Sequence, residues 1–151
     1  MPLFLSVWTI DGAKWTMKQL KDYVAFNGKK SEQSRLYGFE VDPSTFHPST
    51  YPHQADVAAF ALKTGRALVA MSFGLGKTHV QLLKAKAVYE ETGKRFLIVC
   101  PLGVKHQFIE EDGPRMGLDV RYVTCDEDIA AAPTPYLVTN YERVREGNIS
   151  P

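Results

Sequence analysis

From residue 52 onward, the apolar positions alternate between helical and strand-like spacing. A helix is expected from Pro52 to about residue 63, with Val57, Phe60 and Ala61 on one side. The expected strands cover residues 67–71, 95–100, 118–124 and 136–139, and helices or turns follow at 78–91, 104–111, 126–132 and 140–145. This alternation predicts an α/β fold with a parallel sheet that is covered by helices on both faces.

The first 51 residues carry weaker patterns. Residues 4–10 alternate loosely, as in an edge strand, and residues 15–26 have helix-spaced apolar positions that end at Asn27-Gly28. Residues 42–51 are rich in Pro, Ser and Thr and are expected to be irregular. We therefore expect residues 1–37 to be an N-terminal extension of a domain that covers residues 38–151.

A glycine-rich turn joins the expected strand at 67–71 to the helix after it. The residues are Ser72, Phe73, Gly74, Leu75, Gly76, Lys77 and Thr78. Strand, glycine loop, Lys-Thr and helix in this order are typical of a phosphate-binding P-loop. Its backbone N–H groups and the helix start bind phosphate oxygens, Lys77 adds a positive charge, and the Thr78 hydroxyl ligates Mg²⁺. The usual motif has a glycine where this sequence has Met71.

Composition limits the class of protein without choosing a function. The chain has 151 residues, 44% hydrophobic and 23% charged, as expected for one ordinary globular domain. No apolar segment is long enough to span a bilayer, so no membrane partner is expected. Cys100 and Cys125 show no metal or disulfide spacing, which favours a reducing, cytoplasmic location. The net charge of +1 neither indicates nor excludes nucleic-acid binding.

Four sequence blocks in a fixed order resemble the first RecA-like lobe of superfamily 2 helicases. They are 51–54 (YPHQ), 73–78 (FGLGKT), 97–107 (beginning LIVCPLGV) and 138–142 (VTNYE). The resemblance is strongest to SWI2/SNF2-like and DEAD/DEAH-box helicases of phages and prophages, and it also accounts for Met71. It covers residues 38–151, and it implies a P-loop NTPase, with ATP and Mg²⁺ as cofactors, in the cytoplasm of a bacterial host.

The resemblance also implies roles for single residues. Gln54 corresponds to a glutamine that reads adenine, and an upstream aromatic residue, either Phe39 or Tyr51, stacks on the base. Lys77 and Thr78 are the catalytic phosphate and magnesium residues. The implied non-specific contacts to the DNA backbone come from two strand ends. These contacts are made by Pro101, Leu102, Gly103, Gln107, Thr139 and Asn140.

The hydrolytic half of such an enzyme is not visible. The family has an apolar strand that ends in Asp-Glu, its Walker B motif, after the block at 138–142. Asp126-Glu127 follows a strand, but it precedes that block and is interpreted as a helix start. We therefore expect an incomplete lobe that ends before Walker B and needs a second RecA-like lobe in cis or trans.

Two functions follow as hypotheses. In the first, the chain is the ATP-binding N-terminal portion of an ATP-dependent DNA helicase or translocase, with negligible hydrolysis alone. In the second, it is a stand-alone P-loop module that binds nucleotide or a partner and has no helicase activity.

Overall fold

The computed structural model describes residues 21–22, 25 and 37–150. The strand expected at 4–10 lies outside these residues, as does most of the helix expected at 15–26; Lys21, Asp22 and Ala25 are helical. The chain divides into two units, Met1–Arg35 and Leu36–Pro151, and the second unit carries the fold described below.

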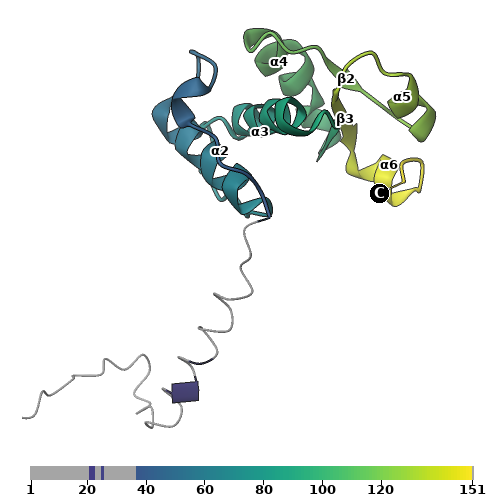
Figure 1. Ribbon diagram of the computed structural model, residues 1–151. Coiled ribbons are helices and arrows are strands. Elements are labelled where there is room, and N and C mark those ends of the chain that lie inside the picture. The colour runs from purple at the N-terminus through teal and green to yellow at the C-terminus, as the bar shows by residue number, and fades with distance from the viewer. Residues whose placement is uncertain (1–20, 23–24, 26–36, 151) are drawn as a thin grey trace, which may run out of the picture. The chain divides into compact units, whose positions relative to one another are not determined.

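Helices and strands of the second unit follow the predicted order from residue 77 onward (Figure 1). The helices are α2 (Pro52–Thr64), α3 (Lys77–Thr92), α4 (Gly113–Arg115), α5 (Asp126–Ala131) and α6 (Tyr141–Arg145). The strands are β1 (Phe96–Cys100), β2 (Val120–Tyr122) and β3 (Tyr136–Asn140). Short 3-10 helices cover Pro43–Thr45 and Leu102–Val104, and a π-helix covers Gln107–Asp112. Residues 42–51 are otherwise irregular, as expected.

The three strands form one parallel sheet in the order β1-β3-β2. In the register, Phe96 lies beside Tyr136 on one edge of β3, and Val120 lies beside Tyr136 on the other. The central strand β3 therefore has both edges paired, while β1 and β2 are the outer strands. The α/β class and the parallel sheet are as predicted.

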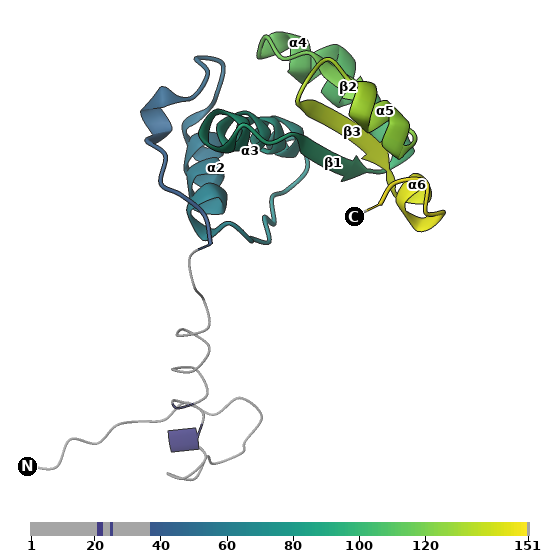
Figure 2. The ribbon, with the colours of Figure 1, turned by 45° about the vertical axis from the view of Figure 1, so that its right-hand side comes forward.

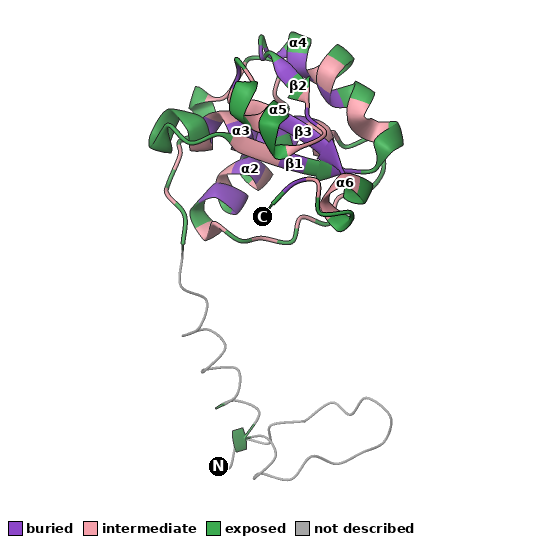
Figure 3. Cartoon of the chain, turned by 90° about the vertical axis from the view of Figure 1, so that its right-hand side faces the viewer, coloured by how far each residue is buried: buried purple, intermediate pink, exposed green. Residues whose placement is uncertain are grey.

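Helices cover both faces of this sheet (Figures 2 and 3). On one face, Ile98, Cys100 and Val138 pack with side chains from α2, α3 and the π-helix. On the other face, Leu97 and Leu137 pack against Ile129 of α5 and against Ile149. Packing on both faces explains why β1 is a continuous apolar run in the sequence, whereas β3 ends in the polar residues Thr139 and Asn140.

The strand expected at residues 67–71 is not formed, so that prediction is wrong. Within the described chain, none of its backbone groups hydrogen-bonds to another backbone group. A strand is defined by pairing with a neighbour, and no other strand of the described sheet reaches this segment. Its side chains still alternate in exposure, and Leu68 is 93% exposed. None of its residues is fully buried, and the described sheet supplies no strand that pairs with it.

The helix expected at 104–111 forms in an unusual geometry. The chain continues from the π-helix directly into α4 at Gly113. A Cβ at Gly113 would lie 2.4 Å from the Phe108 carbonyl oxygen and 2.9 Å from the Val120 side chain. Glycine is therefore required where this widened helix lies against β2.

In the described part of the chain, no helix combines the length and apolar character needed to cross a membrane.

Candidate functional site

The loop before α3 has the backbone geometry that its glycines predict. Gly74 and Gly76 have φ angles of 79° and 77°, in the region that favours glycine. Helix α3 begins at Lys77, and its N-cap residue, Gly76, offers no side chain to its first N–H groups. The helix has 16 residues, so its dipole adds positive potential at this end. Loop and helix start together present unoccupied N–H donors to an anion.

The Lys77 ammonium group holds the two ends of the loop together. It donates hydrogen bonds to the carbonyl oxygens of Met71 (2.9 Å) and Ser72 (3.0 Å). It also lies 5.1 Å from the centre of the Phe73 ring, whose side chain is 99% exposed. The cation is thus inside the loop, at the place where a bound phosphate would require it.

A cleft of about 540 Å³ opens beside this loop. One wall carries Gly74, Gly76, Lys77 and Thr78. The opposite wall comes from the segment after β1 and from the residue after β3, and its members are Pro101, Val104, Gln107, Phe108 and Tyr141. Because the carboxyl ends of parallel strands meet at one edge of a sheet, both segments reach the loop. The volume is in the range of small-molecule sites.

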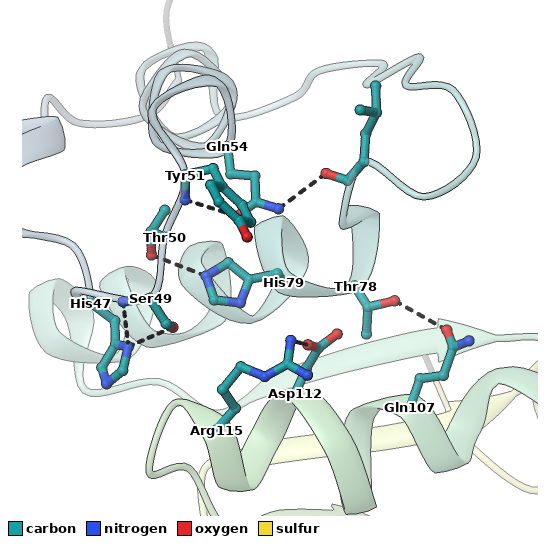
Figure 4. A network of polar contacts seen from close by, with 11 residues as sticks. His47, Ser49, Thr50, Tyr51, Gln54, Thr78, His79, Gln107, Asp112 and Arg115 are labelled. Atoms are coloured by element: carbon teal, nitrogen blue, oxygen red, sulfur yellow. Dashed lines mark hydrogen bonds and ion pairs between the residues drawn. The ribbon is translucent and has the colours of Figure 1, made fainter.

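Thr78 and Gln107 face each other across the cleft (Figure 4). The Thr78 hydroxyl donates to the Gln107 Oε1 atom at 3.5 Å, a long hydrogen bond. No Asp or Glu side chain lines the described cleft. No cluster of three or more His, Cys, Asp or Glu residues capable of holding a metal occurs among the described residues. A magnesium ion here would have the Thr78 hydroxyl and phosphate oxygens as ligands.

Gln54 connects α2 to the glycine loop (Figure 4). Its Oε1 atom accepts from the Tyr51 N–H group, and its Nε2 atom donates to the Leu75 carbonyl oxygen, both at 3.1 Å. A Cβ at Gly76 would lie 2.2 Å from Nε2. Gln54 is 6% exposed, so its first role here is to fix the loop position. One amide hydrogen and one lone pair remain for a base.

The structure separates the two aromatic residues proposed to stack on the base. Tyr51 is adjacent to Gln54, is 65% exposed, and stacks against His53 with ring centres 5.9 Å apart. Phe39 is half-buried, and its N–H group donates to the Leu62 carbonyl oxygen near the other end of α2. Eight residues of helix separate Gln54 from Leu62, or about 12 Å. Only Tyr51 lies on the Gln54 side.

Residues expected at the nucleic-acid interface divide into two groups. Pro101, Leu102, Gly103 and Gln107 are exposed, and Pro101 and Gln107 line the cleft. Thr139 and Asn140, in contrast, are buried at 0% and 5% exposure. The Thr139 hydroxyl donates to the Val123 carbonyl oxygen (2.9 Å), and Asn140 accepts from the Tyr122 hydroxyl (3.2 Å). In this structure, these two side chains stabilise the end of β3 and do not face solvent.

Tyr141 is a cleft residue that sequence reasoning did not assign to the site. It is 56% exposed and follows β3 directly. Its position at the carboxyl end of a predicted parallel strand could have identified Tyr141 from the sequence.

Asp126-Glu127 begins α5, as interpreted from the sequence. Asp126 accepts a hydrogen bond from the Ser150 N–H group at 3.0 Å. Ile129 of the same helix packs on the sheet face opposite to α3, and neither acidic residue lines the cleft.

His79 lies behind the loop, on the buried side of α3. It is 3% exposed, and its Nε2 atom hydrogen-bonds the Thr50 hydroxyl at 3.0 Å (Figure 4). Burial lowers the His79 pKa; nearby Asp112 opposes this change, while Arg115 and His47 add to it. The neutral ring is therefore the form that the folded chain prefers.

We expect acid to destabilise the fold through His79. Its folded-state pKa lies below the unfolded value of about 6.5, so the unfolded chain binds the proton more readily. The stability that the neutral His79 ring contributes to the fold is complete above pH 6.5 and is lost as the pH falls below this value. Urea denaturation at pH 7.5 and 5.5 should show that the free energy of unfolding falls less between these pH values in His79→Gln than in the parent chain. The glutamine amide can still hydrogen-bond to Thr50. An equal loss in both proteins would contradict this assignment.

Comparison of the chain with protein-family models, with curated proteins and with solved structures gave no significant match.

Proposed function

We propose that this chain binds ATP with Mg²⁺ in the cleft beside the glycine loop. One observation carries the proposal. Two glycines with positive φ lead into an uncapped 16-residue helix, with Lys77 and Thr78 at its start and an open cleft before them. Loops of this kind bind phosphate because several N–H groups converge on one oxygen-rich anion.

In this proposal, each part of the loop has a separate task. The N–H groups of residues 74–78 cradle the phosphates, and Lys77 leaves the Met71 and Ser72 carbonyls to contact the β- and γ-phosphates. Magnesium, when bound, neutralises phosphate charge, and Thr78 is the side chain placed to ligate it. The base lies against Gln54 and the exposed Tyr51 side chain. It hydrogen-bonds to the remaining amide hydrogen and the remaining lone pair of Gln54.

We further propose that the chain is the ATP-binding N-terminal portion of an ATP-dependent DNA helicase or translocase of phage or prophage type. Such a protein would act in the cytoplasm of a bacterial host. Support comes from Pro101, Leu102, Gly103 and Gln107, which are all exposed, and two of which, Pro101 and Gln107, line the cleft beside the glycine loop. Contacts from this segment to a DNA backbone would link nucleotide state to DNA binding. Buried Thr139 and Asn140 would support the segment without touching DNA.

The described cleft favours binding without turnover for the chain alone. Hydrolysis needs a carboxylate that orients the attacking water, and no carboxylate lines this cleft. In the family that the sequence resembles, this carboxylate belongs to the Walker B strand, and a second RecA-like lobe, in cis or trans, completes the site. The same observation supports the second candidate function, a P-loop module that binds nucleotide and a partner but does not hydrolyse ATP.

Titration calorimetry of the full chain tests nucleotide binding directly. We expect ATP with Mg²⁺ to bind more tightly than ADP, and AMP to bind weakly or not at all, because the loop contacts the phosphates. Phosphate release should stay at background with or without DNA. Absence of ATP binding at millimolar concentration, or equal binding of AMP and ATP, would overturn the proposal.

A further inference from the structure

The side-chain amide of Gln54 is held in one orientation by two backbone groups. The Tyr51 N–H group can only donate, so it bonds to the Oε1 atom, and the Leu75 carbonyl oxygen can only accept, so it bonds to the Nε2 atom. If the amide turned over, both bonds would be lost, because oxygen would face oxygen and N–H would face N–H. The buried Gln54 amide is therefore a fixed donor to the glycine loop.

This donor sets the direction of the peptide group between Leu75 and Gly76. The described chain has no cis peptide bond, and in a trans peptide the C=O group and the following N–H group point to opposite sides. Because the Leu75 carbonyl faces Gln54, the Gly76 N–H group faces away from it. Gly76 lines the cleft, and among the described residues its N–H group donates to no backbone carbonyl. This N–H group is therefore available to an anion in the cleft.

Glycine at position 76 gives the same peptide a second orientation. The φ angle of Gly76 is 77°, and a half-turn of the preceding peptide changes it to a negative value that glycine adopts equally well. The turned peptide would present the Leu75 carbonyl oxygen to the cleft in place of the Gly76 N–H group. A carbonyl oxygen repels phosphate, so the hydrogen bond from Gln54 selects the orientation that attracts it.

A second hydrogen bond holds the start of α2 against the start of α3. The Thr50 hydroxyl bonds to the Nε2 atom of His79 at 3.0 Å, and Thr50 directly precedes Tyr51, whose N–H group holds the Gln54 amide. In the described chain, this bond and the bond from Gln54 to Leu75 are the side-chain hydrogen bonds that join residues 47–54 to residues 71–79 (Figure 4). Thr50 therefore supports the position from which Gln54 reaches the loop.

We propose that Gln54 is a positioning residue for phosphate binding, which keeps the Gly76 N–H group directed toward the cleft. The inference rests on the proposed function, since it assumes that the phosphates of a nucleotide bind in this cleft. It assigns Gln54 a task that base recognition does not include. A residue that reads the base affects only ligands that carry the base, whereas a residue that orients the loop affects every polyphosphate.

Titration calorimetry of the full chain with ATP and with inorganic tripolyphosphate, both with Mg²⁺, separates these two tasks. Gln54→Met keeps the length of the side chain and removes its hydrogen bonds. We expect its affinity for tripolyphosphate to fall about tenfold, because one N–H donor to the anion is lost, and its affinity for ATP to fall at least as much. Weaker ATP binding with unchanged tripolyphosphate binding would assign Gln54 to the base alone and overturn the inference.

Three threonine variants test the support from Thr50. Thr50→Val should weaken tripolyphosphate binding, and Thr50→Ser, which keeps the hydroxyl, should bind like the parent chain. Thr64→Val is the matched control, because it also removes one side-chain hydrogen bond of α2, from Thr64 to the Phe60 carbonyl oxygen at 2.7 Å, but at the other end of the helix. Equal losses in both valine variants would contradict the inference. These variants test it even if Gln54→Met does not fold.

The Gly76 amide gives a direct reading by NMR. Its proton signal should move downfield as tripolyphosphate is added to the parent chain, because the N–H group then donates to an anion. The Gly93 amide at the other end of α3 already donates to the Tyr89 carbonyl oxygen at 2.8 Å, and its signal should not move. A parent chain that binds neither ATP nor tripolyphosphate would overturn the proposed function, and this inference with it. Binding of both with an unmoved Gly76 signal would overturn the inference alone.

Discussion

Replacement of Lys77 by alanine is expected to weaken the binding of ATP with Mg²⁺ by about 100-fold or more. The ammonium group has no other cationic substitute at the loop, since the remaining residues from 71 to 78 carry no positive charge. Its two hydrogen bonds to the Met71 and Ser72 carbonyls show that it reaches the centre of the loop. Charge-assisted bonds contribute about 1.5–3 kcal/mol each, and two of them to phosphates account for this loss.

Lys86→Ala provides the matched control for this experiment. Lys86 is on the same helix, pairs with Glu90 at 3.5 Å, and does not line the cleft. Both variants should keep the unfolding midpoint of the parent chain within a small margin, because neither removes a buried group. Titration calorimetry should then show that Lys86→Ala binds ATP with Mg²⁺ about as tightly as the parent chain does, while Lys77→Ala binds it more weakly. Unchanged affinity in Lys77→Ala would place the nucleotide elsewhere, or would mean that none binds.

The parts of the site that could be predicted from the sequence are set by local chemistry. The positive φ angles of Gly74 and Gly76 follow from glycine in a tight loop, and the start of α3 at Lys77 follows from the change in periodicity after it. The strand β1 follows from a continuous apolar run of five residues, which suits a strand that is covered on both faces, and β3 follows from a shorter apolar stretch after Pro133 and Pro135.

The parts that could not be predicted depend on contacts between distant residues. Residues 67–71 have a strand pattern, but pairing requires a neighbour that the described residues do not supply. Thr139 has the chemistry of a phosphate contact, yet its hydroxyl is used by the Val123 carbonyl 16 residues away. The resemblance implies that Gln54 recognises a base, while its hydrogen bond to the Leu75 carbonyl depends on how α2 packs against the loop. A residue type shows what a side chain can bond, while the fold decides which partner it has.

Replacement of Phe108 by alanine is expected to have the largest effect on stability. Phe108 is 1% exposed and belongs to the main core, where it packs with residues of α3 and the sheet. It lies in the π-helix that runs into Gly113, and the close contact of Gly113 with β2 limits how far that helix can move inward. The cavity left by the ring will therefore not collapse, and we expect the free energy of unfolding to fall by about 3–5 kcal/mol. A domain stabilised by only about 5–15 kcal/mol would retain a small margin or unfold.

Phe73→Ala is the matched control, because both rings line the same cleft and lose the same atoms. Phe73 is 99% exposed, so its removal should change the free energy of unfolding by no more than about 0.5 kcal/mol. Urea denaturation followed by circular dichroism gives both values. If Phe108→Ala were as stable as Phe73→Ala, the π-helix would not be packed on the sheet in solution. The wall of the cleft formed by Gln107 and Val104 would then be missing as well, and ATP would meet only the glycine loop.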